Sequence, residues 1–151
     1  MPEQVTLTAA RQVAGIAART SNARERDPST AALPDLWARF AAGPAPASGP
    51  ARPVYGVYTE YDSDVDGDYT ALIGREGAPT RPAERTVTLP AGSYLVFTST
   101  GEMPGAVIAG WQEVWAYFAR PDAPARAYTA DFEYHDPAHP STVRIHVAVD
   151  E

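Results

Sequence analysis

The second half of the chain repeats the first half in the same order. Three segments recur: VTL at residues 5–7 and 87–89, LWARF at 36–40 and VWAYF at 114–118, and Tyr55, Glu60 and Tyr61 against Tyr128, Glu133 and Tyr134. The offsets between the copies are 82, 78 and 73 residues. This period is too long for a solenoid repeat, so it indicates two copies of one supersecondary unit.

Each copy predicts a strand, a helix and two further strands. In the first half, about residues 1–74, we expect a strand Val5–Thr20 that bends near Gly15, followed by a polar loop to Ser29. A helix then runs from Ser29 or Thr30 to about Ala42. After a Pro/Gly/Ala linker over 43–53 come the strands Val54–Tyr61 and Tyr69–Ile73. In the second half, about residues 84–151, they are strands Thr86–Leu89 and Tyr94–Thr98, a helix Pro104–Phe118, and strands Arg126–Tyr134 and Val143–Val149.

Short connections between these strands favour antiparallel pairing. The sequence therefore predicts one α+β domain over residues 1–151, in which the duplicated units form an antiparallel sheet with two helices. A cleft between the two units is the expected place for a small molecule.

Composition excludes several classes of function. The chain has no cysteine, which rules out disulfides and thiolate chemistry, and its net charge of -7 argues against direct nucleic-acid binding and favours cations. No apolar run is long enough for a membrane span and no leader pattern is present, so we expect a cytoplasmic location. The acidic turn at Asp62–Gly67 lacks the glutamate that a calcium loop needs, since Ile73 takes that position. We therefore expect neither metal nor cofactor.

One acidic residue stands out because of its surroundings. Glu133 lies between Phe132 and Tyr134 in a strand expected to be buried, where a carboxylate is costly unless it is paired or hydrogen-bonded. It is either an anionic anchor for a cationic ligand or a structural acid satisfied by a tyrosine or an arginine. Glu60 holds the matching place in the first copy, so the sequence leaves open which of the two faces the cleft.

Aromatic side chains are the other candidate ligand contacts. Trp111 has Leu33 as its counterpart in the first copy, so packing does not demand an indole there, and stacking on a flat or cationic ligand is its alternative role. Trp115 lies on the same helical stripe and is a candidate for the core or for the site. Tyr69 and Tyr94 are further candidates for the walls of the cleft.

The chain resembles the GyrI-like effector-binding family. The resemblance covers nearly the whole chain and rests on VYGVYTEY followed by DSDVDGDYTALIG, on TLPAGSYLVFTSTGEMP, on GWQEVWAYF and on DFEYHDP. It implies a duplicated fold with a central ligand groove, and it assigns the family's characteristic acid to Glu133. Fused members are AraC-type and MerR-type regulators, but this chain lacks a helix-turn-helix segment.

Two classes of function follow. The first is a standalone module that binds small amphipathic or cationic organic molecules through Glu133 and an aromatic cleft. The alternative, which the resemblance implies, is a hydrolase of cyclopropane-bearing natural products with Glu133 as general base. A protein-partner role, like that of the gyrase inhibitor in the same family, is a third possibility.

Overall fold

The computed structural model describes residues 2–42, 52–63, 66–79 and 82–150. These residues form eight strands and three helices: β1 (Glu3–Leu7), β2 (Arg11–Ser21), α1 (Asn22–Glu25), α2 (Leu33–Ala42), β3 (Val54–Thr59), β4 (Asp68–Glu76), β5 (Arg85–Leu89), β6 (Gly92–Thr100), α3 (Gly105–Phe118), β7 (Ala130–His135) and β8 (Thr142–Ala148). All strands belong to one sheet in the order β1-β6-β8-β7-β3-β4-β2-β5, and neighbours are antiparallel. The α+β class and the antiparallel sheet predicted from the sequence are confirmed.

The strand order is symmetrical about the central β3–β7 pair. Exchanging β1 with β5, β2 with β6, β3 with β7 and β4 with β8 reproduces the same order read from the opposite edge. β1 pairs with β6 from the second half, and β5 pairs with β2 from the first. The two halves therefore exchange their first strands instead of forming two separate sheets.

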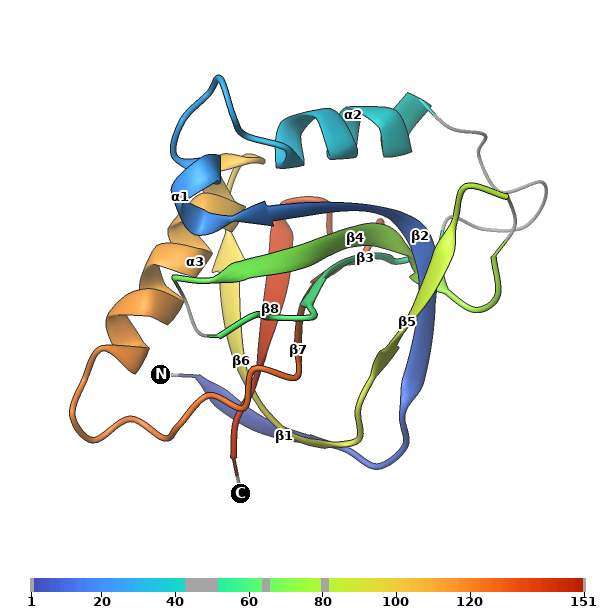
Figure 1. Cartoon of the computed structure of the whole chain (residues 1–151). Coiled ribbons are helices and arrows are strands. Elements are labelled where there is room, and N and C mark those ends of the chain that lie inside the picture. Colours follow the sequence, from blue (N-terminus) through green and yellow to red (C-terminus); the bar gives the residue numbers. More distant parts are fainter. Residues whose placement is uncertain (1, 43–51, 64–65, 80–81, 151) are drawn as a thin grey trace.

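The long strand β2 curves because it changes partners along its length (Figure 1). Its first residues, Arg11–Gly15, pair with β5, and residues 13–21 pair with β4. Opposite Gly15 lies Gly74, where an added Cβ would stand 1.9 Å from the Ala14 carbonyl oxygen. Only glycine permits so close an approach of two backbones, and the bend predicted near Gly15 lies where the partners change.

The helices cover one face of the curled sheet, which we call the outer face (Figure 1). α3 packs on β6 and β8, and α2 packs on β2 and β4. The inner face carries a cluster of buried strand residues: Leu7, Val13, Tyr55, Val57, Leu72, Val87, Leu89, Tyr94, Ala130, Phe132 and Ala148. The outer face of the central strands β3 and β7 therefore lies between the two long helices.

Two predicted boundaries near the N-terminus are wrong. A single strand over Val5–Thr20 is broken at residues 8–10, because β1 leaves to pair with β6 at the other edge of the sheet. The polar loop after Thr20 contains the short helix α1, whose N-cap Ser21 accepts a hydrogen bond from the Arg24 backbone N–H.

Two other boundaries shift for identifiable reasons. α2 begins at Leu33 instead of Ser29 or Thr30, and the Glu25 carboxylate accepts hydrogen bonds from the backbone N–H groups of Ala32 and Leu33. The strand predicted from Arg126 begins only at Ala130, because Tyr128 has a φ of 54°, which a strand residue does not adopt. Residues 43–51 of the predicted linker lie outside the described residues.

Candidate functional site

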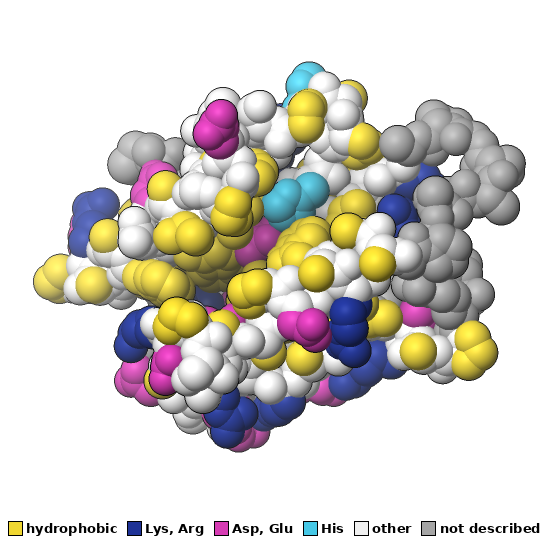
Figure 2. Space-filling model, turned by 90° about the horizontal axis from the view of Figure 1, so that it is seen from above, with side chains coloured by type: hydrophobic (Ala, Val, Ile, Leu, Met, Phe, Trp, Pro, Cys, Tyr) yellow, Lys and Arg dark blue, Asp and Glu magenta, His cyan; other side chains and the backbone are white. Residues whose placement is uncertain are grey.

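A cavity of about 890 Å³ opens on the outer face of the sheet, between α1, α2 and α3. Strands β3, β4 and β7 contribute its floor, because the two long helices leave the centre of the sheet uncovered. Its lining residues are Asn22, Glu25, Arg26, Leu33, Pro34, Trp37, Tyr58, Tyr61, Tyr69, Met103, Pro104, Val107, Ile108, Trp111, Gln112, Trp115, Arg126, Glu133 and His135. Figure 2 shows this hollow, with hydrophobic side chains around it and acidic and histidine side chains at its edge.

Glu133 lies at the floor of the cavity and its side chain is fully buried. One carboxylate oxygen, Oε2, accepts hydrogen bonds from the Tyr58 hydroxyl at 2.6 Å and from the Trp111 indole N–H at 2.7 Å. The other, Oε1, lies 3.0 Å from His135 Nε2. These contacts join β3, α3 and β7 around one carboxylate.

Two of the groups that hold Glu133, the Tyr58 hydroxyl and the Trp111 indole, are neutral donors. Burial, followed by the neighbouring Glu133 charge, raises the pKa of Tyr58 well above its ordinary value. Tyr58 therefore keeps its proton and remains a donor. Among the described residues, no arginine forms an ion pair with Glu133. The carboxylate is thus held by hydrogen bonds and by contact with the His135 ring, without an arginine as its counter-charge.

A second buried acid lies two residues earlier on the same strand. The Asp131 side chain is fully buried, and its Oδ2 accepts hydrogen bonds from Arg126 at 2.7 Å and from the Tyr61 hydroxyl at 2.5 Å. Its Oδ1 accepts the Ala148 backbone N–H at 2.8 Å. Arg126 also lines the cavity, but its charge is neutralised by Asp131. The pair is therefore a structural bridge between the C-terminal segments.

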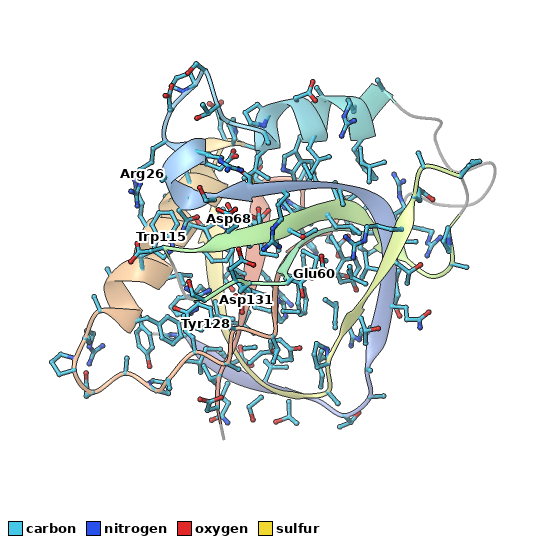
Figure 3. The ribbon with its side chains drawn as sticks, in the orientation of Figure 1. Arg26, Glu60, Asp68, Trp115, Tyr128 and Asp131 are labelled. Atoms are coloured by element: carbon cyan, nitrogen blue, oxygen red, sulfur yellow. The ribbon has the colours of Figure 1, made fainter. Side chains whose placement is uncertain are left out.

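A third acid, Glu25, connects the helices α1 and α2, which form one wall of the cavity. Glu25 caps α2 as described above and also accepts a hydrogen bond from the Thr20 hydroxyl. Burial, with smaller contributions from Glu25 and Glu133, raises the pKa of Tyr69, which therefore stays neutral in the wall. At the opening, Trp115 of α3 and Arg26, which follows α1, both line the cavity and are exposed (Figure 3).

Four of the five predicted site residues lie in the cavity wall: Glu133, Trp111, Tyr69 and Trp115. Trp111 contacts the Glu133 carboxylate directly, and it also contacts Trp115 one turn along α3, with ring centroids 6.2 Å apart.

Tyr94, the fifth predicted site residue, lies outside the cavity. Strand alternation places it on the inner face, where its ring packs against Phe132 and its hydroxyl donates to the Pro90 carbonyl oxygen. Glu60 lies outside the cavity as well. It follows the end of β3 with a φ of 53° and forms an exposed ion pair with Arg85 (Figure 3). Of the two acids that the repeat aligns, Glu133 is the one that faces the cavity.

Three lining residues close to Glu133 were not among the five predicted site residues: Tyr58, His135 and Trp37. His135 follows Glu133 by two positions on the same strand, so strand alternation alone places both on one face. Trp37 packs edge-on against His135, with ring centroids 5.2 Å apart. Tyr58 carried no local signal, because its contact with Glu133 depends on the pairing of β3 with β7.

Within the described residues, no group of three or more His, Asp or Glu side chains is arranged to hold a metal ion. No described helix is long and apolar enough to cross a membrane.

Comparison with known proteins identifies the family. The model of the Cass2 family, integron-associated effector binding proteins, matches residues 5–149. The chain belongs to this family. Among solved structures, an integron cassette protein from the mobile metagenome of Vibrio cholerae shares 36% identity over 99% of this chain and 95% of that one, with a TM-score of 0.90. The function class that the family model supports is effector binding.

More distant structures share the fold alone. One, solved with tetraphenylphosphonium bound, is 19% identical over 99% of this chain and 94% of that one, with a TM-score of 0.74. Another, a putative transcription regulation protein from Staphylococcus aureus MU50, is 20% identical over 100% and 99%, with a TM-score of 0.76. No curated protein sequence matches the chain significantly.

Proposed function

We propose that this Cass2-family protein binds hydrophobic organic cations in the outer-face cavity, with Glu133 as the counter-charge. The observation that carries the proposal is a fully buried carboxylate that lines a cavity and is held mainly by neutral donors. Burying such a charge without a cationic partner is costly, and a bound cation offsets that cost. An anionic or neutral ligand offers no such compensation.

The aromatic walls suit the same ligand. Tyr58 contacts Trp111 and Tyr69 edge-on, with ring centroids 5.3 and 5.7 Å apart, so the three rings form one cluster beside Glu133. The faces of such rings attract cations as well as apolar groups. The volume of about 890 Å³ accommodates a drug-sized molecule. The relative of similar fold that holds tetraphenylphosphonium binds a ligand of this chemical class.

Intrinsic fluorescence gives a direct assay, because all three tryptophans of the chain, Trp37, Trp111 and Trp115, line the cavity. We expect tetraphenylphosphonium to quench this fluorescence saturably. Triphenylphosphine oxide, which carries similar rings without the charge, should bind much more weakly. Calorimetric titration of both compounds provides the dissociation constants.

Glu133→Gln is the decisive variant, with Glu60→Gln as its matched control on an exposed ion pair outside the cavity. Loss of a Coulomb attraction of about 2–3 kcal/mol, at an effective dielectric of about 20, predicts that Glu133→Gln weakens tetraphenylphosphonium binding roughly 30-fold to 150-fold. Glu60→Gln should leave the affinity unchanged. Equal affinity of Glu133→Gln and the parent for the cation would remove the anchor role.

Hydrolysis is the second candidate, and the Glu133–His135 contact favours it, since a carboxylate beside an imidazole in a cavity can direct a water molecule. It ranks below binding because Tyr58, Trp111 and His135 already occupy hydrogen-bonding positions of the carboxylate that a water would need. Incubation of the protein with a cyclopropane-bearing natural product, followed by mass spectrometry, tests it. Addition of 18 mass units to the compound, absent with Glu133→Gln, would support the hydrolase, and an unchanged mass would count against it for that compound.

A further inference from the structure

A second cavity, of about 710 Å³, opens on the inner face of the sheet. Its lining residues are Arg11, Arg52, Pro53, Tyr55, Glu76, Gly77, Phe132, Tyr134, Arg144 and His146. It shares no residue with the first cavity. On β7, Glu133 lines the first cavity while its neighbours Phe132 and Tyr134 line the second, so the two cavities lie on opposite faces of one strand.

The charges of this second cavity are opposite to those of the first. Three guanidinium groups reach it from three separate elements: Arg11 from the start of β2, Arg52 from the segment before β3, and Arg144 from β8. Glu76 is the one carboxylate among its lining residues, which leaves two net positive charges when His146 is neutral. The chain as a whole carries -7, so this concentration of positive charge opposes the overall balance.

These arginines also differ from most others in the chain in their partners. Arg19, Arg39, Arg85, Arg120 and Arg126 each form an ion pair with an Asp or a Glu. Among the described residues, no such pair involves Arg11, Arg52 or Arg144. Arg52 instead donates to the backbone carbonyl oxygen of Glu76, which fixes its position at the rim without neutralising its charge.

The floor of the second cavity is aromatic. Phe132 and His146 are stacked, with ring centroids 4.2 Å apart and an interplanar angle of 12°. Tyr55 packs against Phe132 at an interplanar angle of 40° and edge-on against Tyr134. Cross-strand pairing places Arg144 directly beside Tyr134 and His146 beside Phe132. A flat ring lying on this floor would therefore bring a substituent within reach of the guanidinium groups at the rim.

We propose that the inner-face cavity is a second ligand site, which binds a small aromatic carboxylate. The ring packs on the part-exposed rings of Tyr134 and His146, which lie over the buried Tyr55 and Phe132. The carboxylate accepts hydrogen bonds from the arginines, whose forked geometry matches it. A bulky dianionic group is disfavoured by Glu76. The site is independent of the cation site, since it occupies the other face of the sheet.

His146, which lines the second cavity, is exposed to the positive charge of its arginines. Burial, together with the positive charges of Arg11 and Arg144, lowers the pKa of His146 to about 4. A carboxylate bound among the arginines opposes their charge. The pKa of His146 should therefore rise when the site is occupied.

The three histidines of the chain separate the two sites in one experiment. His135 lines the first cavity, His146 lines the second, and His139 lies in the turn before β8 and lines neither. Imidazole signals are followed by NMR during titration with benzoate, with benzamide as the uncharged probe of the same shape, and with inorganic phosphate as an anion without a ring. We expect benzoate to shift the His146 signal saturably and to leave His135 and His139 unmoved.

Two variants test the arginines, and one serves as their control. Arg144→Gln and Arg11→Gln should each weaken benzoate binding about fivefold to tenfold, because each removes one charge-assisted hydrogen bond near the surface. Arg120→Gln, which alters an exposed arginine paired with Asp122, should change nothing.

Several results would overturn the proposal. These are no saturable shift of His146 with benzoate, equal shifts with benzamide, phosphate binding as tight as benzoate binding, or full affinity in both Arg144→Gln and Arg11→Gln. Benzoate that moves His135 and quenches the tryptophans would place the acid in the first cavity and also contradict it. Failure here leaves the cation site untouched, since tetraphenylphosphonium is read from the tryptophans.

Discussion

Asp131 and Glu133 lie two residues apart on β7, point to the same face, and are both fully buried. Their partners differ in kind. Asp131 has a full counter-charge in Arg126 together with a backbone N–H and a tyrosine hydroxyl. Glu133 has a tyrosine, an indole and an imidazole.

The difference indicates how one strand carries a structural acid next to the acid that we propose as the ligand anchor. An acid whose charge is neutralised within the chain gains little from a ligand, whereas an acid surrounded by neutral dipoles retains its attraction for a cation. Burial alone therefore does not identify a binding residue. The partners of the buried charge do.

The largest predicted effect is that of Asp131→Asn. The substitution leaves the Arg126 guanidinium, which is only 7% exposed, without its counter-charge. Breaking a buried pair in this way costs about 3–5 kcal/mol of unfolding free energy. Urea denaturation at pH 7, followed by tryptophan fluorescence, measures it. A loss under about 1 kcal/mol would mean that the pair is not structural.

Glu133→Gln is the matched control for that experiment. The glutamine oxygen accepts the same hydrogen bonds from Tyr58 and Trp111, and its amide reaches His135, so the unfolding free energy should change by no more than about 1 kcal/mol. The cation affinity should fall as described above. If Glu133→Gln were as destabilising as Asp131→Asn, the distinction between the two acids would be lost.

His146 makes the unfolding free energy depend on pH, apart from any effect of the two acids. Its folded-state pKa of about 4 lies below its ordinary value of 6.5. The unfolded chain therefore takes up a proton that the folded chain refuses, and stability falls as the pH drops from 6.5 towards 4, by about 2–3 kcal/mol.

His146→Gln should remove this part of the pH dependence, and whatever loss remains belongs to the other groups, the carboxylates among them. The measurement is urea denaturation of parent and variant at several pH values between 4 and 7, with NMR titration of the imidazole. A parent and a variant with the same pH dependence would show that His146 titrates normally in the folded state.

The sequence predicted the acid but not its surroundings. Glu133 was found because it stands between two aromatic residues in a strand, and Trp111 because the repeat offers no reason for an indole there. Their contact could not be predicted, since the distance between α3 and β7 depends on packing. The contact of Tyr58 with Glu133 was not predicted for the same reason, because it depends on the register of β3 with β7.

The repeat also misled at one point. Identity between the copies aligns Glu60 with Glu133, but Glu133 lies inside β7 and pairs with Gly56, whereas Glu60 follows β3 in a left-handed conformation. Loop lengths differ between the halves, so matching residues need not hold matching places in the sheet. The duplicated order of elements was predictable, and the register within it was not.

Trp111→Phe changes the neutral environment of Glu133 and leaves Asp131 alone. It removes the indole N–H that donates to Oε2 at 2.7 Å, and we expect a loss of about 1–2 kcal/mol of unfolding free energy. In the Glu133→Gln background the loss should be smaller, since the donor then faces a neutral acceptor. A double-mutant cycle measures this coupling, and strictly additive effects would show that the hydrogen bond contributes nothing.

The smallest predicted effect is that of Gly56→Ala, which acts on Glu133 from the strand opposite. Gly56 pairs with Glu133, whereas Asp131 pairs with Tyr58. A Cβ at Gly56 would lie 3.1 Å from Glu133 Oε1, so the carboxylate must shift, whereas the Trp37 ring at 3.4 Å would remain in ordinary contact. We expect a loss of about 1 kcal/mol of stability and severalfold weaker binding of tetraphenylphosphonium.

Gly105→Ala is the control for this substitution, because a Cβ at the start of α3 meets no atom within 4 Å. It should change neither stability nor affinity appreciably. Gly56→Ala with unchanged cation affinity would show that the carboxylate tolerates displacement and that its position is not set by the glycine. The arginine pair on Asp131 should be unaffected in either variant, so the unfolding free energy lost by Asp131→Asn should be the same in the Gly56→Ala background.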